Sequence, residues 1–226
     1  RVDARSHAAR RTFKHQVRLR QTDFEIPVEQ HNGQSQSMPS IYKALAADEV
    51  RNALIFDDVL AALGAGRHPV VLTERRDHLE RLRGRLEGSV RNLVVLRGGM
   101  NSAERQAAEI ALQVADDQER LVLATGRYLG EGFDDPRLDT LFLTMPISWK
   151  GTLAQYVGRL HRNHKDKSEV VVYDYVDTGV PLLARMAAKR QIGYRGLGYT
   201  IELRDAVSDT RAGRGVSPHV VPLSER

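Results

Sequence analysis

The chain has 226 residues, of which 41% are hydrophobic and 28% charged, with a formal net charge of +5 and no cysteine. This length and apolar content are sufficient for one domain with its own core. The absence of cysteine excludes a disulfide scaffold and a thiolate zinc site, and it suits a reducing cytoplasm, which is the expected location. No apolar run approaches the roughly 20 residues that cross a membrane, so we expect no membrane partner.

Residues 1–37 are expected to form a basic N-terminal arm or linker. The first 16 are basic and polar, and the residues Val17, Leu19, Gln21 and Phe24 hint at an extended segment. Residues 31–40 are rich in turn-forming residues and predict a loop. The start lacks both an initiator methionine and the apolar core of a signal peptide. We therefore expect the chain to be a piece of a longer polypeptide.

A helical region follows the arm. Between Ile41 and Leu63, apolar residues recur every three to five positions, which predicts helix. Asp48 is a candidate start of a second helix within this region, and Gly64 and Gly66 are expected to end it.

From residue 69 onward, short apolar runs alternate with helical patterns. Helices are expected at 74–86, at 101–115 with a capping box of Asn101 and Glu104, from Thr152, and at 180–191. Thr73 and Thr152 are candidate helix caps. The expected strands are 69–72, 92–96, 121–124, 141–143 and 169–175, followed by an edge strand at 200–203.

This alternation predicts an α/β fold in which helices cover both faces of a parallel sheet. In such sheets, ligands bind beyond the carboxyl ends of the strands. Thr73, Gly98–Gly99, Thr125 and the loop after Leu143 each follow a strand directly. We therefore expect them to meet at one edge of the sheet. Residues 205–226 are polar, show no period and are expected to form a tail.

The helix from Thr152 carries a polar pattern. Gln155, Arg159 and Arg162 are spaced i, i+4, i+7, which predicts that they share one face. Such a cationic face is well suited to binding phosphate oxygens.

Two segments resemble motifs of superfamily-2 helicases of the DEAD/DEAH type. Ala124-Thr125-Gly126 followed by Glu131-Gly132-Phe133-Asp134 resembles motif V, and Gln155–Arg162, QYVGRLHR, resembles the Q-x-x-G-R-x-x-R of motif VI. The strand and helix around Thr73 resemble motif IV. The resemblance covers residues 69–177 and is similar to bacterial helicases of the restriction-subunit and DNA-repair type.

This resemblance implies that residues 38–204 form the C-terminal RecA-like lobe of such an enzyme, a three-layer fold related to the P-loop NTPases. Arg162 would be the arginine finger and Arg159 the second arginine, while Gln155 would position the nucleotide or its attacking water. Gly158 would permit close approach of the backbone to the nucleotide.

In the motif V region the resemblance assigns further nucleotide contacts. Gly132 and Asp134 would meet the nucleotide, with Asp134 reaching the ribose, and Glu131 would couple the two sites. The residues expected to hold the nucleic-acid backbone are Thr125, Thr73, Gly99, Arg105, Trp149 and Lys150. DNA is expected in preference to RNA.

The chain has no G-x-x-x-x-G-K-[ST] and no D-E-x-[DH]. The parts that hold ATP and Mg²⁺ would therefore lie in an N-terminal RecA-like lobe of the same polypeptide. Alone, the chain is expected to bind ATP poorly and to hydrolyse none. We expect no metal site in it, since His161 and His164 have no third ligand nearby in the sequence.

Several of these residues have structural explanations as well. Thr73 and Thr125 can act as caps of helices or turns, Asp134 can cap the turn before Pro136, and Trp149 can be a packed aromatic residue. Two other functions compete with a motor lobe. One is a non-catalytic nucleic-acid-binding module with the same fold, and the other is a dinucleotide-binding domain, whose G-x-G-x-x-G motif is missing.

Overall fold

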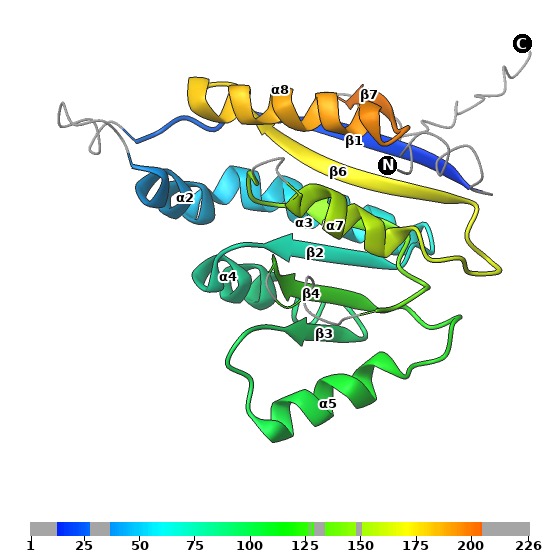
Figure 1. The fold of residues 1–226 in the computed structure, drawn as a ribbon. Helices are drawn as coiled ribbons and strands as arrows, with labels where there is room; N and C mark the ends of the chain where they lie inside the picture. The colour runs from blue at the N-terminus through cyan, green and yellow to red at the C-terminus, as the bar shows by residue number, and fades with distance from the viewer. Residues whose placement is uncertain (1–12, 28–36, 127, 129–133, 148–150, 205–226) are drawn as a thin grey trace, which may run out of the picture.

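The computed structural model describes residues 13–27, 37–126, 128, 134–147 and 151–204. Its centre is a seven-stranded sheet in the order β3-β4-β2-β5-β6-β1-β7, and every strand pair is parallel (Figure 1). The parallel α/β fold predicted from the sequence is therefore confirmed. The strands are β1 (Lys14–Thr22), β2 (Pro69–Thr73), β3 (Leu93–Leu96), β4 (Leu121–Thr125), β5 (Thr140–Leu143), β6 (Glu169–Asp177) and β7 (Thr200–Arg204).

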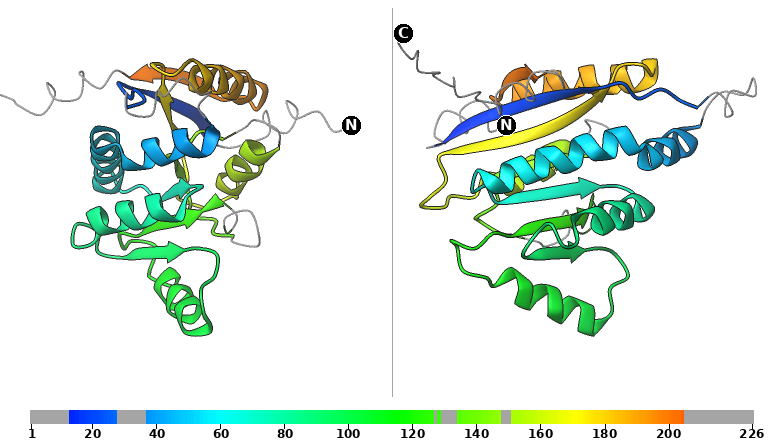
Figure 2. Two further views of the ribbon diagram at one scale, coloured as in Figure 1. Left: turned by 90° about the vertical axis from the view of Figure 1, so that its left-hand side faces the viewer. Right: turned by 180° about the vertical axis from the view of Figure 1, so that it is seen from behind.

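Helices cover both faces of this sheet. One face packs against α5 (Ser102–Leu112), α7 (Thr152–Leu160) and α8 (Pro181–Gly196), and the other packs against α3 (Glu49–Gly64) and α4 (Arg76–Leu86) (Figure 2). Helix α2 (Met38–Ala47) packs with Phe24, Met145 and Leu183 in a third, smaller cluster. No helix in the described part of the chain is long and apolar enough to cross a membrane.

The central strands and the helix starts follow from local sequence. All five residues of β2 are buried, as expected of a strand covered on both faces. Asp48 caps α3 by accepting a hydrogen bond from the backbone N–H of Arg51. Asn101 and Glu104 form the predicted capping box at the start of α5. These side chains satisfy backbone N–H groups that a helix cannot satisfy internally.

The N-terminal region differs from the expected arm. Lys14–Thr22 forms β1, which lies between β6 and β7 and pairs with β6 along its whole length. Its apolar side chains, Val17 and Leu19, are buried in the core. Its polar side chains also have partners, because Arg18 donates to the hydroxyl of Tyr173 at 2.7 Å. These nine residues therefore belong to the domain, and the extended segment that Val17 and Leu19 hint at is one of its strands.

Some element boundaries also differ from the predicted ones. Helix α4 begins at Arg76, two residues later than expected, because Thr73 belongs to β2 and the chain must first turn away from the strand. Helix α7 is capped by Gly151, with a positive φ of 85°, whereas Thr152 is its first residue. At their C-terminal ends, α5 is shorter and α8 longer than predicted, ending at Leu112 and Gly196.

A buried histidine joins β2, α4 and α3. His78 is fully buried; its Nδ1 lies 2.9 Å from the hydroxyl of Thr73, and its Nε2 lies 2.9 Å from Oδ1 of Asn52. Because the amide oxygen of Asn52 can only accept, the neutral ring donates from Nε2 and accepts at Nδ1. Burial lowers the pKa of His78 to about 3. The ring is therefore neutral in the folded protein at every pH near neutrality.

We expect His78 to make the fold less stable as the pH falls. A histidine whose pKa is lower in the folded than in the unfolded state contributes stability above its unfolded pKa of about 6.5, and this stability is lost below it. From this group alone, the free energy of unfolding should drop by about 1.4 kcal/mol between roughly pH 7.5 and 5.5. Urea denaturation at the two pH values measures the drop. Since His78→Gln keeps hydrogen-bonding groups but does not titrate, an equal drop in that variant would contradict the prediction.

Candidate nucleotide and nucleic-acid site

Two of the predicted nucleic-acid contacts lie side by side at the carboxyl ends of neighbouring strands. Thr73 ends β2 and Thr125 ends β4, and the parallel register pairs them directly. The hydroxyl of Thr73 lies fully inside the protein, where it bonds to His78 and accepts a hydrogen bond from the backbone N–H of Arg75. Thr125 is half-buried. Of the two hydroxyls, that of Thr125 is the more accessible to a ligand.

The loop after β3 supplies two more predicted contacts at the same end of the sheet. Gly99 is exposed and has a φ of 76°. Residues with a Cβ atom rarely adopt this backbone angle, so the turn itself requires glycine. Arg105 is exposed on α5, and its Nε donates to the carbonyl of Met100 at 3.1 Å. Because β3 neighbours β4 in the sheet, this loop and Thr125 follow adjacent strands. The predicted meeting of post-strand residues at one edge is therefore observed for β2, β3 and β4.

A close contact connects this edge with α7. The hydroxyl of Tyr156, on α7, donates to Oε1 of Glu74, the residue after β2, at 3.1 Å. Gly126, the residue after β4, lies against both: a Cβ atom there would be 2.2 Å from Oε1 of Glu74 and 2.3 Å from the hydroxyl of Tyr156. A side chain at position 126 would thus displace both. Sequence reasoning missed Glu74 and Tyr156, since nothing in the sequence pairs them.

Helix α7 presents the motif VI residues on its outer side. Leu153, Val157 and Leu160 are buried against the sheet, whereas Gln155 and Gly158 are exposed and Arg159 is half-buried. A Cβ atom on Gly158 would meet no described atom within 4 Å. Because α7 is amphipathic, its polar residues lie on the side of the helix that faces away from the sheet.

The candidate arginine finger, Arg162, does not lie on the helix. The sequence predicts that it shares a helical face with Gln155 and Arg159, but α7 ends at Leu160 with His161 as its C-cap. Arg162 lies in the turn that follows. The predicted shared face is therefore wrong for Arg162, because the helix ends two residues before it.

The turn brings Arg162 to Asp134, another predicted nucleotide contact. Nη2 of Arg162 lies 2.9 Å from Oδ2 of Asp134, and its Nε donates to Oδ1 at 3.1 Å. The guanidinium thus makes two parallel bonds to the carboxylate, as it can to the oxygens of a phosphate. The two side chains are 57% and 42% exposed, and a pair this open contributes little to stability. An anionic ligand can therefore compete for this arginine.

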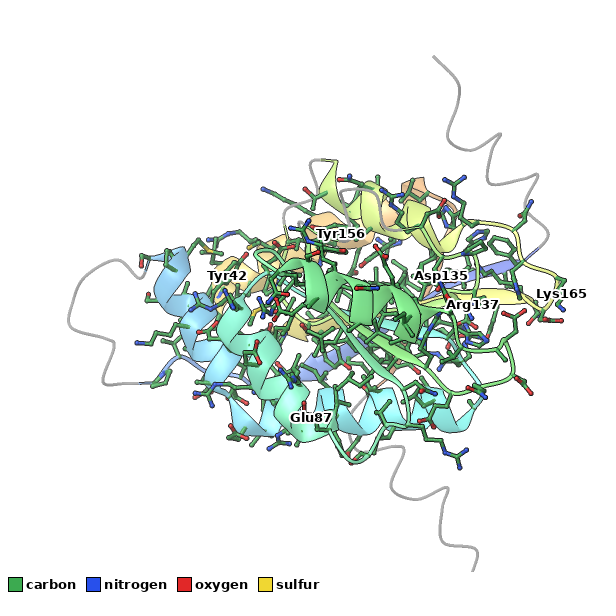
Figure 3. All side chains as sticks on the ribbon, turned by 90° about the horizontal axis from the view of Figure 1, so that it is seen from below. Tyr42, Glu87, Asp135, Arg137, Tyr156 and Lys165 are labelled. Carbon is green, nitrogen blue, oxygen red and sulfur yellow. The ribbon has the colours of Figure 1, made fainter. Side chains whose placement is uncertain are left out.

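The candidate residues form two groups along the molecule. Strand β5 ends where the other strands end, and β6 begins at the opposite edge, so α7 and its turn carry the chain back across the sheet. Figure 3 labels Tyr156 between Tyr42, whose hydroxyl donates to the carbonyl of Pro146 just after β5, and Asp135 and Arg137, which lie farther to the right. Thr125 and Gly99 follow their strands and therefore lie at the carboxyl edge, whereas Arg162 follows the C-terminal end of α7.

Four predicted site residues lie outside the described part of the chain, so their assignments stay predictions. These four residues are Glu131, Gly132, Trp149 and Lys150.

In the described part of the chain, no group of three or more histidine or acidic side chains is arranged to hold a metal ion.

No family model matches the chain. Among curated proteins, it is 27% identical over 140 residues to "Transcript termination protein A18" of Cowpox virus (strain Brighton Red), which covers 61% of this chain and 28% of that protein. It is 34% identical over 86 residues to "Uncharacterized protein 108L" of Invertebrate iridescent virus 3, and this match covers 38% of this chain and 78% of that protein. The chain spans less than a third of the length of the transcript termination proteins it matches.

Two solved structures have a fold similar to that of this chain. T4 UvsW superposes with a TM-score of 0.64 at 14% identity, over 85% of this chain and 41% of that one. The C-terminal domain of the DEAD-box protein Dbp5 superposes with a TM-score of 0.53 at 13% identity, over 86% and 91% of the two chains. The seven-stranded parallel sheet thus has the architecture of RecA-like helicase lobes.

Proposed function

We propose that this chain, which belongs to the same family as protein 108L of Invertebrate iridescent virus 3, is the C-terminal motor lobe of an ATP-dependent nucleic-acid helicase or translocase. In this proposal the lobe supplies arginines to an ATP molecule held by a first lobe of the same polypeptide. The same lobe also binds the nucleic-acid backbone. The RecA-like fold supports the general class. We also propose that the enzyme is a helicase of the restriction-subunit or DNA-repair type and that it is cytoplasmic.

The observation that carries the proposal is the exposed Arg162–Asp134 pair at the end of α7. Phosphoryl transfer requires charge to be neutralised on the transferring group, and arginine does this through its planar, always charged fork. When ATP is present, its phosphate oxygens would replace the carboxylate as partners of Arg162. Asp134 would then be released to accept a hydrogen bond from the ribose, as the resemblance to motif V implies.

The first lobe would hold most of the nucleotide. The described part of this chain has no acidic cluster for a metal ion, and the sequence has no phosphate-binding loop. Mg²⁺, when bound beside the β- and γ-phosphates, would neutralise part of their charge. Gln155, Arg159 and Gly158 would complete the nucleotide site from the side of α7.

The nucleic acid would run along the carboxyl edge. The hydroxyl of Thr125 and the backbone at Gly99 can bind phosphates without reading bases, and Arg105 adds a positive charge. A motor that moves along a strand needs contacts of this kind, because they do not depend on sequence. We propose DNA as the nucleic acid.

An ATPase assay with magnesium on two proteins tests the proposal. The chain alone should hydrolyse no ATP, whereas the full-length protein, with both lobes, should hydrolyse ATP faster when single-stranded DNA is added. RNA of the same sequence, assayed in parallel, distinguishes the two nucleic acids. If the full-length protein binds DNA but hydrolyses no ATP, the chain is a non-catalytic nucleic-acid-binding module. If the chain alone hydrolyses ATP, the proposal that a separate first lobe must hold the nucleotide is wrong.

A further inference from the structure

A lysine closes the turn that carries Arg162. The last carbonyl groups of a helix have no partner within the helix, and a nearby cation can satisfy them. At the end of α7, Nζ of Lys167 donates to the carbonyl of Leu160 at 2.9 Å and to that of Arg162 at 2.8 Å. The backbone of Lys167 also donates to the carbonyl of His164, which folds the loop back toward the helix. One side chain therefore ties the helix end to the residue after its C-cap.

Lys167 makes these bonds from a buried position. Only 9% of the residue is exposed, and Nζ lies 5.7 Å from the centre of the Phe13 ring. Among the described residues, no carboxylate lies within ion-pair distance of Nζ, so its strong hydrogen bonds go to the turn. Burial lowers the pKa of Lys167 to about 8, which leaves it mainly charged at neutral pH. Burying a cation without an acidic partner is unfavourable, and a surface lysine would suffice as a simple helix cap.

The position of Arg162 makes such an anchor useful. Its backbone lies beyond the hydrogen bonds of α7, and its side chain is largely exposed. A turn at a helix end opens easily when few contacts hold it. Displacing a reacting or charge-stabilising group by about 1 Å can cost about 10²-fold in rate.

We propose that Lys167 is a positioning residue that holds the backbone of Arg162 so that its guanidinium reaches the transferring phosphate. This inference rests on the proposed function, since it assigns Lys167 a part in the same reaction. Lys167 itself touches neither the nucleotide nor the nucleic acid in this proposal. Its effect on the rate passes through Arg162 alone, which distinguishes it from a residue that only stabilises the fold.

A double-mutant cycle in the full-length protein tests this dependence. We expect Lys167→Met to lower the DNA-stimulated kcat about 10- to 100-fold, while the KM for ATP changes less than about threefold. In an Arg162→Ala background, the same change should lower kcat no further. The matched control is Lys165→Met, which removes an exposed lysine two residues away and should leave kcat unchanged. Thermal unfolding of each variant reports on stability separately.

Two kinds of result would overturn the inference and leave the proposed function standing. Equal losses of kcat in the wild-type and Arg162→Ala backgrounds would mean that Lys167 acts without Arg162, while an unchanged kcat for Lys167→Met would mean that the anchor is unnecessary. If Lys167→Met does not fold, Lys167→Gln, which keeps a shorter donor, enters the same cycle with the same expectation. A wild-type protein that hydrolyses no ATP would refute the proposed function, and with it the role of Lys167.

Discussion

Replacing Arg162 by alanine in the full-length protein should lower the DNA-stimulated rate of ATP hydrolysis by about 10³-fold or more. The variant loses the fork that now binds Asp134 and that we propose to bind the transferring phosphate. The loss should appear in kcat, with a smaller change in the KM for ATP, because an arginine finger acts mainly on charge that develops in the transition state. Steady-state ATPase assays at saturating DNA measure both quantities.

Three variants control this experiment. Arg162→Lys keeps the charge but loses the planar fork, so we expect most of the loss to remain. Arg195→Ala removes an exposed arginine near the end of α8 that is not among the predicted site residues, and it should leave the rate unchanged. Asp134→Asn frees Arg162 from its ion pair and should change KM more than kcat. If Arg162→Ala retains the wild-type rate, Arg162 is not the finger.

The second large effect concerns a buried ion pair between β6 and α8. Nε and Nη2 of Arg190 donate to both carboxylate oxygens of Asp174 at 2.8 and 2.7 Å, and neither side chain is more than 1% exposed. Asp174→Ala should lower the free energy of unfolding by about 3–5 kcal/mol, because it leaves a buried guanidinium without its counter-charge. Urea denaturation of the purified chain measures this change.

Two comparisons show whether the buried charge is the cause. Replacing both partners, with Asp174→Leu and Arg190→Met, removes the uncompensated charge and should recover most of the lost stability. Arg85→Ala breaks an exposed ion pair, Arg85–Glu49, whose N–O distance is 2.6 Å, and should cost less than about 1 kcal/mol. A loss below about 1 kcal/mol for Asp174→Ala would contradict the prediction.

Much of the fold was predictable because its signals are local. A strand that is covered on both faces, such as β2, needs a continuous apolar run, and that run is visible without knowing its neighbours. The start of α5 is similarly local, since Asn101 and Glu104 satisfy N–H groups only three residues away. The order of such elements also predicted that Thr125 and Gly99 follow adjacent strands at one edge.

Other features depended on residues far apart in the chain. The sequence only hinted at strand β1, because its polar side chains are satisfied by residues such as Tyr173, which lies 155 positions away from Arg18. For the same reason, the sequence could not pair Tyr156 with Glu74 across 82 positions.

By itself, the sequence determined the alternation of strands and helices, the parallel α/β class and the edge where the post-strand residues meet, because burial and capping act over a few residues. Only the tertiary structure decided where α7 ends, which residue Arg162 pairs with and what holds its turn. Helical spacing placed Arg162 on α7, but the contacts of Asp134 and Lys167 are made with the turn beyond the helix. These contacts are set by the packing of α7 and of the segments on either side of it, which no local pattern encodes.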